Sequence, residues 1–152
     1  MDSFDRKILA SLQRDGRISN QRLAETVGLS PSPCLRRVQR LRDDGVITST
    51  VALLDQAAVS LSILAFVQVS LEDHLPETLS KFDGLVESSE EILECHALSG
   101  EYDYLLKVVA KDMDHFEQFL TRGLLSGRGV NSANTSFVLK QKKNTTVLPI
   151  PE

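Results

Sequence analysis

Residues 30–42, SPSPCLRRVQRLR, hold four arginines and no acidic residue. Two prolines stand near the start of this run and none follows, which suits a helix. Ser30 is a good N-cap, and Pro31 falls at the first helical position, where a missing N–H costs nothing. Gly45 is suited to end the helix as the residue after its C-cap. The run therefore predicts a helix with a basic surface.

The basic and apolar residues of this predicted helix separate onto different faces. The apolar stripe follows a spacing of three, through Leu35, Val38 and Leu41. The polar face follows a spacing of four, through Ser32, Arg36 and Arg40. Like charges at that spacing destabilise an isolated helix by about 0.2–0.5 kcal/mol. Such a face is either well solvated or built to meet phosphate.

Charge is unevenly distributed along the chain, although its formal net charge is −4. Residues 1–50 hold nine Lys or Arg against six Asp or Glu, whereas the remaining residues hold eight against fifteen. A basic half beside an acidic half indicates that the first half faces a polyanion. The acidic half would repel DNA and is expected to lie away from it.

The first fifty residues also predict two shorter helices before the basic one. Asp2 or Ser3 can cap the first, and Ser19 or Asn20 can cap the second, which Gly28 ends. Three short helices with a basic third helix are typical of a helix-turn-helix DNA-binding domain. The β-prone residues 46–53 are expected to form a wing or strand. The candidate DNA contacts are Asn20, Gln21, Ser30, Ser32, Arg36, Arg37 and Arg40.

The rest of the chain predicts an α+β domain of the order β-α-β-β-α-β, the ferredoxin-like pattern. The expected elements are strand 61–71, helix 76–88, strand 92–98, strand 104–110, a helix from Asp112 or Asp114 to Leu124, strand 129–139 and a possible short strand 145–148. Two helices cover only one face of such a sheet, yet its strands are apolar on both sides. A second copy covering the open face is the economical solution, which predicts a homodimer.

A second candidate site is the turn SGEYD between two predicted strands. Glycine allows a ligand to approach free amides, and the acids could pair with an ammonium group. Such a site would suit an amino acid, although most turns of this kind only connect two strands. The candidate effector contacts are Ser99, Gly100, Glu101, Tyr102, Asp103, Thr135 and Ser136.

Other classes of function find little support in the sequence. Its three histidines lack metal-ligand spacing, and no catalytic constellation or phosphate-binding loop is evident, so neither an enzyme nor a metal or other cofactor is expected. Cys34 and Cys95 are predicted to be reduced thiols, Cys34 in helix packing. Without a membrane-length apolar run or a signal peptide, a cytoplasmic protein with no membrane partner is expected.

Several motifs carry a resemblance to a known family. They are DRKIL, LSPSPCLRRV, ECHALSGEYDYLLKV and the tail FVLKQKKNTTVLPI. The chain resembles the Lrp/AsnC, or feast/famine, regulators of bacteria and archaea from end to end. The resemblance implies a winged helix-turn-helix in residues 1–50, a linker in 51–61 and a ligand-sensing, oligomerising domain in 62–152.

The resemblance also implies partners. Members of the family bind double-stranded DNA, and their dimers commonly assemble into octamers or wrapped discs. Their effectors, usually amino acids, bind between dimers near the loop that Ser99–Asp103 matches here. The expected function is a transcriptional regulator switched by an amino acid. The alternative is an architectural protein of the same fold that wraps DNA without responding to a ligand.

Overall fold

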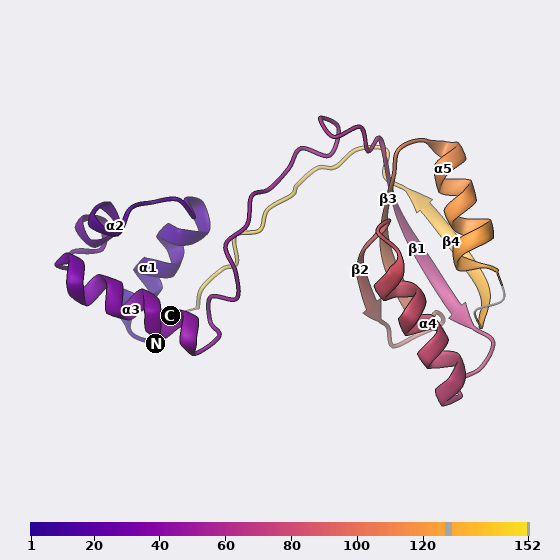
Figure 1. Cartoon of the computed structure of the whole chain (residues 1–152), viewed down its shortest axis with the longest axis horizontal. Coiled ribbons are helices and arrows are strands. Elements are labelled where there is room, and N and C mark those ends of the chain that lie inside the picture. The colour runs from indigo at the N-terminus through magenta and orange to yellow at the C-terminus, as the bar shows by residue number, and fades with distance from the viewer. Residues whose placement is uncertain (127–128, 152) are drawn as a thin grey trace. The chain divides into compact units, whose positions relative to one another are not determined.

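The computed structural model describes residues 1–126 and 129–151. It divides into two compact units, Met1–Leu53 with Lys142–Glu152 and Leu54–Gln141 (Figure 1). The boundary near residue 53 falls within the expected linker. The last residues were expected in the second domain, but residues 142–151 lie in the first unit instead, and Glu152 lies outside the described residues.

The first unit is built from three helices, α1 (Ser3–Arg14), α2 (Asn20–Val27) and α3 (Pro31–Asp43). The α1 helix begins with a capping box, in which Asp2 and Asp5 each accept a hydrogen bond from the other's backbone N–H. The α2 helix ends at Gly28, whose φ of 78° is left-handed. One apolar side of each helix faces a shared core, formed by Ile8, Leu9, Leu23, Ala24, Val27, Cys34, Val38 and Leu41.

Two expected strands are absent from the first unit. Residues 46–53 form no strand, and only Ile47 packs against the core. Val51 and Leu53 are exposed, because these residues meet no strand edge within the part of the chain that the structure describes. Residues 145–148 also form no strand. Gln13 of α1 holds this tail, donating to the Leu148 carbonyl and accepting from the Leu148 N–H at 3.1 and 2.6 Å.

The second unit has the predicted β-α-β-β-α-β order. Its elements are β1 (Ile63–Leu71), α4 (Pro76–Ser88), β2 (Ile92–Ala97), β3 (Tyr104–Ala110), α5 (Met113–Gln118), the π-helix η1 (Phe119–Leu124) and β4 (Val130–Phe137). The strands form one antiparallel sheet in the order β2-β3-β1-β4. Alternation along each strand sends one set of side chains to each face.

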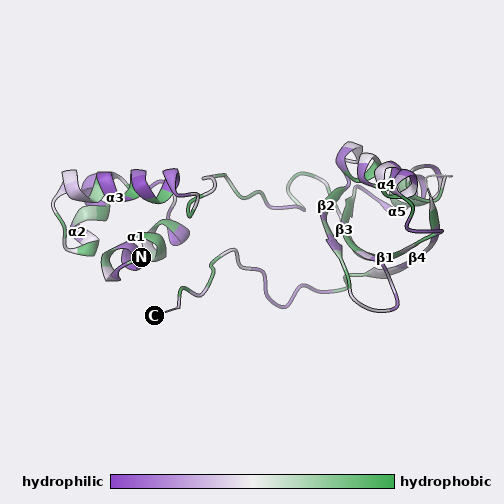
Figure 2. Cartoon of the chain, turned by 90° about the horizontal axis from the view of Figure 1, so that it is seen from below, coloured by the Kyte–Doolittle hydropathy of each residue, from purple (hydrophilic) through white to green (hydrophobic). Residues whose placement is uncertain are grey.

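The α4 and α5 helices of the second unit lie over the same face of the sheet (Figure 2). Ala65, Val67 and Val69 of β1 are fully buried beneath them, together with Phe82 of α4 and Phe116 of α5. Alternate β1 residues, including Phe66, point to the other face and are only partly buried. The sheet therefore has one covered face and one open face, as the sequence predicted. No helix among the described residues is long and apolar enough to cross a membrane.

Candidate functional site

The α3 helix presents Ser32, Arg36 and Arg40 on an exposed face, as the spacing of four predicted. Its buried stripe differs from the prediction. Cys34 takes the place of Leu35 beside Val38 and Leu41, and Leu35 is 55% exposed. The reason is the helical turn: residues 34, 38 and 41 follow the i, i+4, i+7 positions of one face more closely than three residues at constant spacing. Leu35 is thus an exposed apolar side chain of α3 and not a core residue.

The start of α3 also differs from the prediction in one contact. Ser30 occupies the N-cap position, but its hydroxyl accepts no capping hydrogen bond. The usual donors are the N–H groups of the second and third helical residues, and the third is Pro33, which has none. The Ser30 carbonyl instead accepts from the Cys34 N–H at 3.2 Å. The Ser30 hydroxyl therefore remains exposed at the tip of α3.

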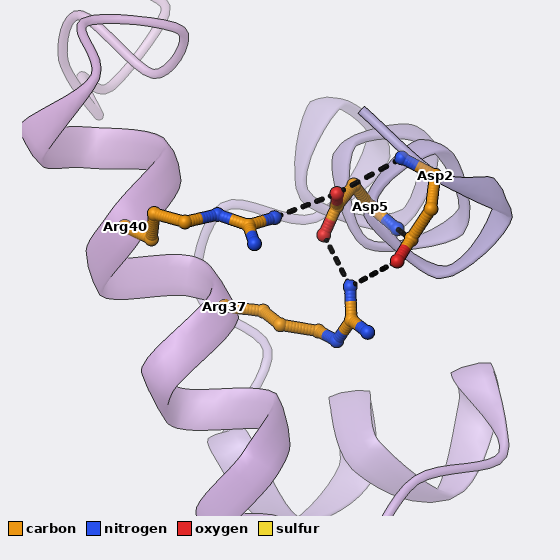
Figure 3. A network of polar contacts seen from close by, with 4 residues as sticks. All are labelled: Asp2, Asp5, Arg37 and Arg40. Carbon is orange, nitrogen blue, oxygen red and sulfur yellow. Dashed lines mark hydrogen bonds and ion pairs between the residues drawn. The ribbon is translucent and has the colours of Figure 1, made fainter.

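Two of the arginines predicted to meet DNA are bound to carboxylates of α1 and its cap (Figure 3). Arg37 Nη1 donates to Asp2 Oδ2 at 2.6 Å and to Asp5 Oδ1 at 2.8 Å. Arg40 Nη2 donates to Asp5 Oδ2 at 2.7 Å. The Arg37 side chain is 26% exposed and that of Arg40 is 52% exposed. Arg37 therefore braces α3 against α1, whereas Arg40 is held on one side and open to solvent on the other.

These contacts also set the protonation of the two acids. Burial acts to raise the pKa of Asp5, but the Asp2 N–H, the Arg37 hydrogen bond and the charge of Arg40 outweigh it and lower the pKa. The Asp5 N–H and the Arg37 hydrogen bond lower the pKa of Asp2 to about 2. Both groups are therefore carboxylates at neutral pH, and both face guanidinium groups.

The two candidates on α2 differ in their contacts. Asn20 Nδ2 donates to the Pro31 carbonyl at 2.9 Å and so ties the start of α2 to the start of α3. Gln21 is exposed, and its Nε2 donates to Glu25 Oε1 at 3.4 Å, one turn along the same helix. Asn20 thus positions the α3 tip, while Gln21 lies on the surface of α2.

The second candidate site is the β2–β3 turn, where Asp103 is engaged by its own chain. Its Oδ2 accepts from the Leu71 N–H at 2.8 Å, and its Oδ1 lies 2.8 Å from His74 Nε2. Its backbone N–H donates to the Val69 carbonyl at 2.9 Å. The Leu71 N–H and then His74 lower the pKa of Asp103. Asp103 therefore fixes the turn to the end of β1.

The other turn residues are available on the surface. Ser99, Gly100 and Glu101 are exposed, and Gly100 has a φ of 150°, which other residues rarely adopt. The Tyr102 hydroxyl accepts from Asn134 Nδ2 of β4 at 3.2 Å. The turn and β4 thus meet at one end of the sheet.

The two hydroxyl candidates on β4 point to opposite faces. Thr135 pairs with the buried Val67 and shares the helix-covered face, whereas Ser136 pairs with Phe66 and lies on the open face with Asn134. The structure thus brings Ser136, but not Thr135, to the side of the sheet that Tyr102 reaches. Sequence reasoning missed Asn134 and His74, since neither lies in a motif. Asn134 is found only through the register of β4, and His74 only through its contact with Asp103.

Family models match both units. A model described as winged helix-turn-helix DNA-binding matches residues 1–48, and one described as Lrp/AsnC ligand binding domain matches residues 64–148. The leucine-responsive regulatory proteins of Salmonella typhimurium and Escherichia coli K12 are each 43% identical to this chain over 150 residues. Those alignments cover 99% of this chain and 92% of each relative.

Solved structures resemble this chain over almost its whole length. A transcriptional regulator of Neisseria meningitidis, crystallised with L-Met, is 45% identical with a TM-score of 0.95, over 98% of this chain and 96% of that one. An AsnC family transcriptional regulator of Agrobacterium tumefaciens is 39% identical with a TM-score of 0.92, over 98% and 97% of the two chains. This chain belongs to the Lrp/AsnC family of DNA-binding transcriptional regulators.

Proposed function

We propose that this regulator reads DNA through the exposed face of α3 and that an amino acid bound at the β2–β3 turn modulates it. The observation that carries the DNA contact is the exposed row Ser32, Arg36 and Arg40, on the third helix of a helix-turn-helix. Arg36 makes no ion pair among the described residues, so its guanidinium is free for a phosphate or a guanine edge. Exposed Ser30 and Gln21 are proposed to contact the phosphate backbone of the DNA, and Asn20 holds the α3 tip in place.

The DNA contact is tested by Arg36→Ala, with Arg17→Ala as a control. Both residues are exposed arginines of the first unit, but Arg17 lies outside the three helices. We expect Arg36→Ala to weaken binding of a duplex selected from a random pool by roughly tenfold or more, and to flatten the slope of log K against log salt by about one. Arg17→Ala should change affinity much less. Equal effects of the two substitutions would show that binding depends on net charge rather than on α3.

The effector proposal depends on the L-Met complex of the Neisseria relative and on the geometry of the turn. Exposed amides and Glu101 could take the carboxylate and the ammonium group of an amino acid, with Tyr102 beside them. Ser136 lies on the same face of the sheet as Asn134, the hydrogen-bond partner of Tyr102. Asp103 supports the turn through Leu71 and His74. Thr135 is proposed to act through packing only, because it lies on the covered face. A second copy of the chain is proposed to complete the site.

A thermal-shift screen against the twenty amino acids tests this effector site. A ligand at about a hundred times its dissociation constant should stabilise the protein by roughly 2.7 kcal/mol. We expect Glu101→Gln to reduce that shift strongly. Glu90→Gln, a change at another exposed acid that follows α4, should keep it. No shift with any amino acid would favour the ligand-independent DNA-wrapping function instead. We further infer that the protein acts in the cytoplasm, by binding rather than by catalysis.

A further inference from the structure

Asp5 stands apart from every other acid that the structure describes, because it is the one charged side chain that is buried, at 1% exposed. Its Oδ2 accepts from Arg40 Nη2 at 2.7 Å and from the Asp2 N–H at 3.0 Å. Its Oδ1 accepts from Arg37 Nη1 at 2.8 Å. One carboxylate thus holds both arginines that α3 directs toward α1 (Figure 3).

The two arginines are held differently. Arg37 is bound by two carboxylates and is largely covered, whereas Arg40 is bound through one nitrogen and keeps 52% of its side chain exposed. The remaining N–H groups of Arg40 are therefore free, on a guanidinium whose direction Asp5 sets. Arg36, one helical turn earlier, has no such partner among the described residues.

We propose that Asp5 is a positioning residue that determines the specificity of DNA binding, by fixing Arg40 for one contact on the DNA surface. This proposal assumes that α3 is the DNA-reading helix. A guanidinium whose rotamer is already fixed loses less freedom when it binds, so its contact favours one geometry over others. The Asp5 carboxylate also cancels positive charge that would otherwise attract any duplex, since non-specific affinity follows the number of phosphates neutralised.

Removal of the Asp5 charge should therefore affect the affinity for a selected duplex and the affinity for a scrambled duplex differently. Without the Asp5 charge, Arg40 becomes mobile and the first unit gains one positive charge. Affinity for a selected duplex should fall, while affinity for a scrambled duplex should hold or rise. A residue that only stabilised the fold would lower both affinities together. The ratio of the two affinities therefore separates a positioning role from a structural one.

The chain offers a matched control in Asp2. Asp2 belongs to the same capping box and binds Arg37, but it makes no hydrogen bond or ion pair with Arg40. Asp2→Asn and Asp5→Asn change the net charge equally and keep the size of each side chain. If charge alone mattered, the two variants would behave alike.

The experiment measures binding of full-length protein to a duplex selected by the wild type and to a scrambled duplex, over a range of salt. We expect Asp5→Asn to lower the specificity ratio by roughly tenfold and Asp2→Asn to leave it within about twofold. Arg40→Ala, which leaves the α1 capping box intact, should lower the ratio as far as Asp5→Asn. Asp5→Asn should have no further effect on the ratio in the Arg40→Ala background.

Three results would overturn the proposal: an unchanged ratio in Asp5→Asn that circular dichroism shows to be folded, an equal loss in Asp2→Asn, or a wild-type ratio in Arg40→Ala. The last result counts even if Asp5→Asn does not fold. These results differ from the one expected if α3 were not the DNA-reading helix. In that case Arg36→Ala would bind the selected duplex with the same affinity as the wild type.

Discussion

Asp2 and Asp5 make the stability of the first unit depend on pH in the acid range. Both pKa values are lowered in the folded protein, that of Asp2 from 3.8 to about 2. A carboxyl group with a depressed folded pKa stabilises the fold above its unfolded pKa, and that stabilisation is lost as pH falls through the folded value. Stability contributed by this pair should therefore be complete above about pH 4 and lost toward pH 2.

The check compares urea unfolding of the wild type with that of the double variant Asp2→Asn/Asp5→Asn. At pH 7 the variant should be less stable, and the difference in the free energy of unfolding should shrink steadily between about pH 4 and pH 2. Carboxylates elsewhere, such as Asp103, titrate equally in both proteins and cancel in the difference. A difference that stays constant over this range would show that the two acids do not stabilise the fold through their charge.

At the scale of the element, two glycines near α4 are expected to respond to alanine in opposite directions. Gly84 lies within α4, and a methyl group there would meet no atom within 4 Å. Gly129, just before β4, has a φ of 80°, and a methyl group there would lie 2.4 Å from Thr78 Cγ2. Gly84→Ala should stabilise the second unit by about 0.5–1 kcal/mol, and Gly129→Ala should destabilise it by about 2 kcal/mol or more.

Chemical denaturation followed by circular dichroism checks both substitutions, and each serves as the control for the other. The prediction for Gly129 depends on the close approach of α4 to the start of β4. If Gly129→Ala had the same effect as Gly84→Ala, that contact would not exist in solution.

The elements themselves show what local sequence can and cannot predict. Helix 76–88 and strand 104–110 have the predicted bounds, because a proline start and a short, almost continuous apolar run are local signals. Residues 46–53 and 145–148 have strand-like composition but form no strand, because a strand also needs an edge to pair with. Composition carries no information about where that edge is.

The candidate sites were also predictable only as far as local sequence patterns reach. The exposed arginines of α3 were predictable from helical spacing, but the capture of Arg37 by Asp2 and Asp5 was not, since these residues are more than thirty positions apart. Asp103 was found by its motif, yet its partners Leu71 and His74 depend on how β1 and β3 align. Local patterns thus predicted the residues of each site, and tertiary contacts decided which of them are free.

At the scale of the whole molecule, the open face of the second unit implies self-association. Phe66 lies there, and Leu64 and Leu105 are also only partly buried, whereas the opposite face is closed by helices. Apolar side chains grouped on an uncovered sheet face are unusual for a monomer, and an identical sheet is a self-complementary partner. We therefore expect the protein to be at least a dimer in solution through this face.

Phe66→Glu tests that interface, with Leu75→Glu as its control. Leu75 is also apolar but is already 61% exposed and is the N-cap residue of α4, outside the strands of the sheet. A carboxylate at Phe66 would be desolvated between two sheets, so Phe66→Glu should shift the mass measured by light scattering toward that of one chain, whereas Leu75→Glu should leave it unchanged. Circular dichroism would confirm that both variants are folded. If folded Phe66→Glu kept the wild-type mass, the copies would associate through a surface other than the open face of the sheet. An effector site completed by a second copy would then have to be sought at that other surface.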